Sequence, residues 1–132
     1  MYPIRICIEG NIAAGKHEIM DILKENFSNN RTIFLSNNLN NWKNKELLFK
    51  FFNETTSHSF FTELKSSVEK ISTVKNNKKQ VIFFEKSWVT DKNCFAKTLY
   101  ELNYMTKDEY ELYVKTYNLI SKPNIDLIIY VF

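Results

Sequence analysis

Short apolar runs alternate along the chain with longer segments in which apolar residues recur every three or four positions. The short runs are rich in β-branched and aromatic residues, and they occupy residues 4–8, 32–35, 81–84 and 125–132. Each run has the length and composition of a β-strand. Residues 81–84 and 125–132 are apolar almost throughout, which is typical of strands that are covered on both faces of a sheet.

The segments between these runs have the periodicity of amphipathic helices. The helix predicted after the first strand presents one apolar face, which is made of Ile19, Ile22, Leu23 and Phe27. Residues 47–74 predict two helices or one broken helix, because Thr55-Thr56-Ser57 interrupts the apolar spacing. Further helices are predicted at 90–101 and 106–121. Thr106 and Glu109 have the spacing of a capping box at the start of the last helix.

The order of these elements predicts the fold. Strand, helix, strand, helices, strand, helices and strand follow one another, which implies an α/β fold with a mostly parallel sheet and helices on both faces, in three layers. The 132 residues suit one domain, which we expect to span residues 1–132. Ligands of such folds bind at the carboxyl ends of the strands, so the residues that follow each strand are the first candidates for a site.

Composition and charge exclude several classes of function. The net charge of +3 is spread over scattered side chains, and the one basic cluster, residues 75–79, lies between apolar segments as a solvated turn would. Nucleic-acid binding is therefore not indicated. No apolar run reaches the roughly 18–20 residues needed to cross a bilayer, so we expect no membrane association. Cys7 and Cys94 lack metal-ligand spacing and suit a reducing, cytoplasmic setting.

The most specific motif follows the first predicted strand directly. It matches the pattern G-x-x-x-x-G-K of a phosphate-binding loop, or P-loop, and consists of Gly10, Asn11, Ile12, Ala13, Ala14, Gly15 and Lys16. In this pattern the backbone wraps a phosphate, amide groups at the helix start donate to it, and the lysine neutralises its oxygens. His17 stands where a Ser or Thr hydroxyl would ligate Mg²⁺, a cation that prefers oxygen. The motif predicts phosphate or nucleotide binding and argues against Mg²⁺.

A second motif, Glu85-Lys86-Ser87, follows the predicted strand at residues 81–84. Together the two motifs resemble the deoxynucleoside kinase family, whose P-loop typically reads I-E-G-N-I-G-A-G-K-S and whose later motif reads E-R-S. The resemblance covers nearly the whole chain and is weakest between residues 29 and 59. It implies phosphoryl transfer from ATP to the 5′-hydroxyl of a deoxynucleoside.

Several catalytic positions implied by the resemblance hold unusual residues. In the family, the Arg of E-R-S stabilises charge and its Glu helps to hold the metal, and these positions are Lys86 and Glu85 here. Lysine keeps the charge but lacks the planar fork of arginine. The family's general base is a Glu in an E-P-V-x-x-W motif. With Trp42 as the anchor, that position is Asn37, whose amide cannot accept the hydroxyl proton.

Substrate-binding positions are implied by the same resemblance. A Gln in an F-Q pair of the family aligns with Glu63, and a residue at the edge of the nucleobase aligns with Asp91. Trp42 is a further candidate, because aromatic faces stack well on bases. Asp91 has a structural alternative as a carboxylate at a helix N-terminus, and Trp42 as a core residue.

The resemblance also bears on association. The family closes its ATP site with an Arg-rich lid after the strand equivalent to residues 125–132, and the given sequence stops before that lid and before the next strand. A long hydrophobic strand edge invites pairing with another chain. We therefore predict a homodimer or another protein partner.

Three functions are compatible with these features. The first is a pseudokinase that keeps a nucleotide-binding P-loop, which the changes at the base, the metal hydroxyl, the arginine and the lid favour. The second is an active but divergent deoxynucleoside kinase. The third is a kinase fold reused as a module for protein interaction.

Overall fold

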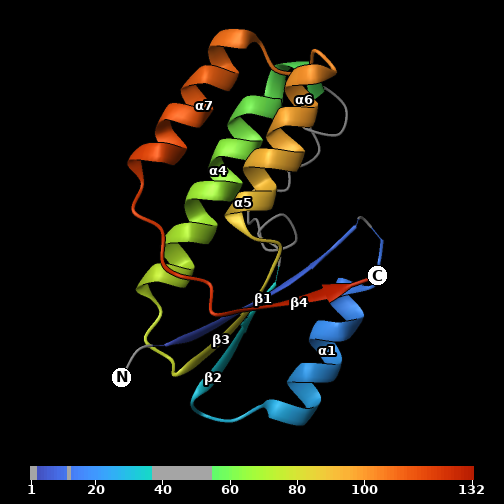
Figure 1. Cartoon of the computed structure of the whole chain (residues 1–132), viewed down its shortest axis with the longest axis vertical. Coiled ribbons are helices and arrows are strands. Elements are labelled where there is room, and N and C mark those ends of the chain that lie inside the picture. The colour runs from blue at the N-terminus through green and yellow to red at the C-terminus, as the bar shows by residue number, and fades with distance from the viewer. Residues whose placement is uncertain (1–2, 12, 37–54) are drawn as a thin grey trace. The chain divides into compact units, whose positions relative to one another are not determined.

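The computed structural model describes residues 3–11, 13–36 and 55–132, with side chains from residue 59 onward in the last range (Figure 1). These residues fall into two compact units. One unit lies within Met1–Asn37, Ser72–Ser87 and Pro123–Phe132, and the other within Asn38–Ile71 and Trp88–Lys122. The first unit contains the sheet, and the second is helical.

The first unit is built on a four-stranded parallel sheet, which Figure 1 labels. Its strands follow the order β2-β3-β1-β4 and are β1 (Ile4–Gly10), β2 (Thr32–Leu35), β3 (Val81–Glu85) and β4 (Leu127–Val131). In the register, Ile8 lies beside Glu85 on one side and Ile129 on the other. All four predicted strands and the α/β class are confirmed. The register brings the carboxyl ends of β1 and β3 together, so the P-loop and Glu85 lie at the same end of the sheet.

Helix α1 (Lys16–Phe27) packs against this sheet. The buried centre of the contact is made of Ile8, Met20 and Phe83. Around it lie partly buried apolar side chains from the strands and the helix, namely Ile6, Ile19, Leu23, Phe34, Val81, Ile129 and Val131. Burial of each large apolar side chain stabilises the unit by roughly 1.5–3 kcal/mol.

The predicted apolar face of α1 was wrong in two positions. Ile22 is 53% exposed and Phe27 is 56% exposed, whereas Met20 is buried. The packed face is centred between Ile19, Met20 and Leu23, and at 100° per residue Ile22 turns away from that centre. Phe27 is the last residue of the helix.

Strand β4 forms one edge of the sheet and pairs with β1. The prediction that this strand is covered on both faces was wrong, because Leu127, Ile128 and Tyr130 are 53%, 56% and 52% exposed. Successive residues of a strand point to opposite faces, so Leu127 and Ile128 show that both faces are partly open to solvent. An apolar run alone does not reveal whether other segments cover it.

The second unit is formed by helices (Figure 1). Helix α4 (Thr55–Asn76) contributes its residues up to Ile71 to this unit. Four further helical segments follow, which are α5 (Trp88–Thr90), the π-helix η1 (Asp91–Ala96), α6 (Lys97–Glu101) and α7 (Lys107–Leu119). The single α-helix predicted over residues 90–101 is therefore interrupted by a π-helix. Apolar spacing over so short a segment does not distinguish the two, and π-turns often occur at functional sites.

Two other helical predictions can be compared with the structure. The capping box is confirmed, because the Glu109 amide donates to Thr106 Oγ1 at 3.1 Å and the Thr106 amide donates to Glu109 Oε1 at 2.8 Å. Helix α4 begins at Thr55, so the Thr55-Thr56-Ser57 segment starts a helix; residues 47–54 lie outside the described residues. None of the helices in the described part of the chain is long and apolar enough to cross a membrane.

Candidate functional site

The P-loop between β1 and α1 requires glycine at both ends. A Cβ atom on Gly10 would lie 2.6 Å from the carbonyl oxygen of Val131, which is closer than real side chains approach. Gly15 has a φ of 97° and is the N-cap of α1, and this left-handed conformation favours glycine. Between them, the Ala14 amide donates to the Asn11 carbonyl at 3.1 Å and closes a turn. The two glycines of the motif are therefore required for different structural reasons.

Ala13 occupies a third special position in the loop. Its φ is 62°, in the left-handed region, where a side chain raises the energy by roughly 1–2 kcal/mol. The family pattern has glycine at this position. The loop therefore keeps its shape here in spite of an unfavourable residue.

Lys16 and the start of α1 provide the positive potential of the loop. Lys16 Nζ donates to the carbonyls of Gly10 at 2.8 Å and Asn11 at 3.2 Å, so its ammonium group lies over the loop. The N-cap of α1 makes no side-chain capping hydrogen bond, which leaves amide groups of the first turn available as donors to an anion. The arrangement of Gly10, Asn11, Ala13, Ala14, Gly15 and Lys16 is suited to binding a phosphate group. Ile12 lies outside the described residues.

His17 faces the carboxylate at the end of β3. Its Nδ1 lies 3.4 Å from Glu85 Oε1, and its Nε2 lies 3.8 Å from Asp21 Oδ2. Glu85 is only 5% exposed, and its Oε1 makes no hydrogen bond within the described chain. The imidazole is therefore the group that approaches this buried oxygen.

The donor set at this position does not fit Mg²⁺. This cation takes oxygen ligands in a nearly ideal octahedron, whereas His17 brings a nitrogen up to Glu85. The described residues contain no group of three or more His, Cys, Asp or Glu that could hold a metal. The argument from the sequence against Mg²⁺, which rests on the missing hydroxyl at residue 17, stays a prediction.

The residues after Glu85 are fixed to β1. Lys86 is buried, has a φ of 56°, and donates its backbone amide to the Ile8 carbonyl at 2.9 Å. The Ser87 amide donates to Glu9 Oε1 at 2.7 Å. Glu9 is itself buried, and we did not single it out as a site residue from the sequence. Its carboxylate holds the backbone of the second motif beside the P-loop strand.

A separate polar cluster lies in the helical unit. Asp91, the first residue of η1, is fully buried, and its Oδ2 accepts a hydrogen bond from Lys70 Nζ at 2.9 Å. Ser67 Oγ lies 3.5 Å from the same oxygen. Lys70 is only 4% exposed. Asp91 is therefore part of a buried ion pair, and its place in the first turn of η1 also agrees with the structural alternative of a carboxylate at a helix N-terminus.

The hydroxyl of Tyr113 extends this cluster to α7. It lies 2.7 Å from Ser67 Oγ, and Tyr113 is fully buried. Burial raises the pKa of the Tyr113 hydroxyl far above its ordinary range, and the nearby carboxylates of Glu63 and Asp91 raise this pKa further. The structure thus brings the predicted substrate residues Glu63 and Asp91 around one tyrosine.

Sequence periodicity did not reveal this cluster because α4 buries a polar stripe. The buried polar residues recur at helical spacing and are Ser59, Thr62, Glu63, Ser66, Ser67 and Lys70. In contrast, Phe61 and Val68 of the apolar pattern are 53% and 37% exposed. The regular spacing of polar residues was the signal available, but a polar face is ordinarily the solvent face. Asn37 and Trp42, the other predicted positions, lie outside the described residues.

Comparison with known proteins agrees with these features. The sequence profile of the deoxynucleoside kinase family matches residues 6–132. The chain belongs to this family. The match includes both motifs, the whole of α4 and the cluster around Asp91, so the resemblance of this chain to deoxynucleoside kinases is confirmed over nearly its full length.

Two curated relatives match most of this chain. It is 31% identical over 116 residues to the probable deoxycytidine kinase of Fowlpox virus (strain NVSL), a match that covers 83% of this chain and 46% of the relative. It is 28% identical over 135 residues to the mitochondrial deoxyguanosine kinase of Xenopus laevis, covering 83% and 49%. The chain spans about half the length of the curated relatives it matches.

Proposed function

We propose that this deoxynucleoside kinase family member binds ATP through its P-loop and a deoxynucleoside through the cluster around Asp91, but transfers phosphate poorly, as a pseudokinase. The observation that carries the binding part is the geometry of the loop. Gly15 opens α1 in a left-handed conformation, and Lys16 lies over the loop carbonyls. These are the groups that hold phosphate in P-loop proteins. Our proposal places the protein in the cytoplasm.

Impaired transfer follows from changes in separate contributors to the reaction. Asn37 stands at the position of the general base, and an amide does not take up a proton. Lys86 lacks the planar fork with which an arginine bridges oxygens. The loss of one group that stabilises developing charge commonly lowers the rate by about 10²–10³. Changes at several such positions leave very little turnover.

The cluster in the helical unit supports nucleoside recognition. Buried polar side chains that are held by one another present fixed donors and acceptors, which is what discrimination between nucleobases requires. Asp91 and Lys70 supply a carboxylate and an ammonium group 2.9 Å apart, and Glu63 supplies a second carboxylate. In our proposal Ser67 and Tyr113 are positioning residues that hold Asp91. The substrate is proposed as a class, because the two relatives are named for different deoxynucleosides.

The proposal predicts that ATP binding depends little on Mg²⁺, since His17 faces Glu85 where a hydroxyl ligand would be needed. Calorimetric titration with ATP should give affinities within about twofold with and without Mg²⁺, a small difference on the scale of affinities. His17→Ser restores the hydroxyl and should make binding more dependent on Mg²⁺. A large gain in affinity of the unaltered chain on adding Mg²⁺ would contradict the proposal.

A second candidate role, association with another copy of the chain or a protein partner, is favoured by the exposure of β4. Leu127, Ile128 and Tyr130 leave apolar area on both faces of an edge strand, and such edges are prone to pair. Ile128→Lys tests the idea without disturbing Ile129, which packs on the core. Sedimentation should show association of the unaltered chain and a shift towards monomer in the variant. A stable monomer at micromolar concentration would refute self-association.

A further inference from the structure

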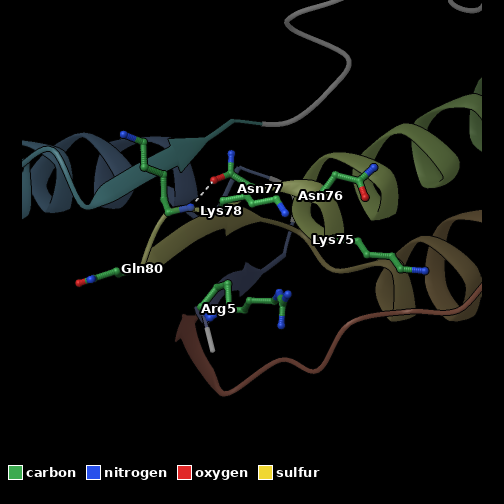
Figure 2. Close-up of a pocket in the computed structure, with 8 residues that line it drawn as sticks. Arg5, Lys75, Asn76, Asn77, Lys78 and Gln80 are labelled. Carbon is green, nitrogen blue, oxygen red and sulfur yellow. Dashed lines mark hydrogen bonds between the residues drawn. The ribbon is translucent and has the colours of Figure 1, made fainter. Parts of the chain in front are cut away.

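A basic pocket lies at the end of the sheet away from the P-loop. Its volume is about 430 Å³. It is lined by residues before and within the start of β1, by the last residues of α4 and by the turn that leads from α4 into β3. Figure 2 shows Arg5 on β1 and the side chains of the turn around it. The strands are parallel, and the pocket adjoins the first residues of β1 and β3, whereas the P-loop follows the last residues of β1. The basic pocket and the P-loop are therefore distinct sites.

Hydrogen bonds hold the walls of the basic pocket in place. The Ile4 amide donates to the Gln80 carbonyl at 2.8 Å, which fixes the turn to β1. Lys79 Nζ donates to the Asn30 carbonyl at 2.9 Å. Within the turn, the Lys79 amide donates to Asn77 Oδ1 at 3.0 Å, the bond drawn as a dashed line in Figure 2. Because its oxygen accepts this bond, Asn77 keeps its amide nitrogen as a donor.

The lining of the basic pocket carries positive charge only. Four of its eight residues are cationic, namely Arg5, Lys75, Lys78 and Lys79, and none is acidic. Over the described residues, Arg5, Lys75 and Lys78 form no ion pair. Arg5 Nε is buried without a hydrogen-bond partner there. The nearby carboxylate of Asp126 accepts a hydrogen bond from the Arg5 backbone amide, at 2.8 Å from its Oδ2.

A solvated turn explains part of this arrangement. Lys75 lies in the last turn of α4, where a cation interacts favourably with the helix C-terminus. That explanation does not extend to Arg5, which comes from a strand far from the turn in the sequence and has a buried donor without an acceptor. Convergence of cations from two elements on one concave surface concentrates positive potential.

We propose that the basic pocket binds a di- or triphosphate group, at a site separate from the P-loop. Its volume falls within the roughly 300–1,000 Å³ of small-molecule sites, and several cations without counter-charges match an anion of high charge density. The Arg5 guanidinium and the Asn77 amide supply directed donors, and Lys75 and Lys78 supply charge. A nucleic-acid backbone would instead need cations spread along a surface, whereas these are gathered in one pocket.

The test uses the Lys16→Ala chain, in which phosphate binding at the P-loop is weakened, and tripolyphosphate as the probe. Calorimetry should still detect one tripolyphosphate per chain. In that background Lys78→Gln, a change at an exposed residue, should weaken tripolyphosphate binding. The double variant with Arg5→Gln and Lys78→Gln should weaken it at least about tenfold, as expected for the loss of charge-assisted bonds. Lys115→Gln, an exposed change of equal charge in the helical unit, should alter affinity less than about twofold at the same ionic strength.

Further arms identify the source of the phosphate and guard against misfolding. Equal affinity for tripolyphosphate and ATP supports recognition of the phosphates alone, and tighter ATP binding supports a nucleotide as the ligand. Loss of all tripolyphosphate binding in Lys16→Ala overturns the proposal. So does an equal loss in Lys115→Gln, or tighter binding of a short DNA duplex than of tripolyphosphate. Circular dichroism identifies any unfolded variant, and Lys78→Gln alone then decides the outcome.

Discussion

The P-loop and the polar cluster around Asp91 are built on opposite principles. The loop consists of consecutive residues, lies at the surface, and presents backbone amides and one lysine. The cluster takes its members from α4, η1 and α7, is buried, and consists of side chains that bond to one another. Changes in the loop should therefore alter ligand binding with little effect on folding. Changes in the cluster should alter folding first, because a buried polar group that loses its partner is strongly unfavourable.

The largest expected effect comes from breaking the buried ion pair. Lys70→Ala leaves the fully buried Asp91 without the ammonium group 2.9 Å away. Breaking such pairs lowers the free energy of unfolding by about 3–5 kcal/mol. Chemical denaturation measures this loss. Lys65→Ala is the matched control, since its pair with Glu69 is partly exposed and should contribute less than about 1 kcal/mol. Equal losses of stability in Lys70→Ala and Lys65→Ala would show that the buried ion pair contributes no more than a partly exposed one.

The next effect tests the loop. Lys16→Ala removes the ammonium group that lies over the Gly10 and Asn11 carbonyls. ATP affinity should fall about 10- to 100-fold, as expected for one charge-assisted contact, while the free energy of unfolding changes by less than about 1 kcal/mol. The amide signals of Gly10 and Gly15 report binding at this loop in a nuclear magnetic resonance titration. Lys24→Ala, in the last turn of α1, should leave the affinity unchanged. An unaltered affinity in Lys16→Ala would show that ATP binds elsewhere.

A smaller effect is expected from Tyr113→Phe, which removes the hydroxyl 2.7 Å from Ser67. At neutral pH the variant should lose about 1 kcal/mol of stability. Because burial raises the pKa of Tyr113, the folded state keeps the proton that the unfolded state releases above about pH 10. The stability that comes from this neutral hydroxyl is present below pH 10 and decreases above it. The difference between the two proteins should therefore narrow above pH 10. A constant difference from pH 8 to pH 11 would contradict this.

The smallest effect concerns the conformation of the loop itself. Ala13→Gly relieves the strain of a left-handed residue with a φ of 62°, which should stabilise the folded state by roughly 1–2 kcal/mol. Glycine also adds conformational freedom to the unfolded chain, which offsets this gain by roughly 0.5–1 kcal/mol. Ala14→Gly, at a position without a positive φ, should only destabilise. Thermal unfolding of the two variants should place Ala13→Gly above Ala14→Gly. The reverse order would indicate that the left-handed residue carries no strain.

The contrast between the two regions also explains what the sequence could predict. Gly10, Gly15 and Lys16 act through local backbone geometry, so a motif of seven consecutive residues is enough to predict them. The four strands were predicted for a similar reason, since each is one short apolar run. The bonds of Ser67 and Lys70 with Asp91 and Tyr113 depend on how separate helices pack, which no local pattern encodes. The exposure of Ile22 and Ile128 was missed because apolar spacing does not tell which side of an element is covered.

The claim that this family member binds nucleotide but transfers phosphate poorly is tested most directly by turnover. Purified chain, with ATP binding shown by calorimetry in the same preparation, is incubated with ATP, Mg²⁺ and each of thymidine, deoxycytidine, deoxyadenosine and deoxyguanosine. Formation of deoxynucleoside 5′-monophosphate is then measured. Our account predicts ATP binding without product above the protein-free background for any of the four. Turnover at ordinary enzyme rates, roughly 1–10³ per second, for any one of them would contradict it.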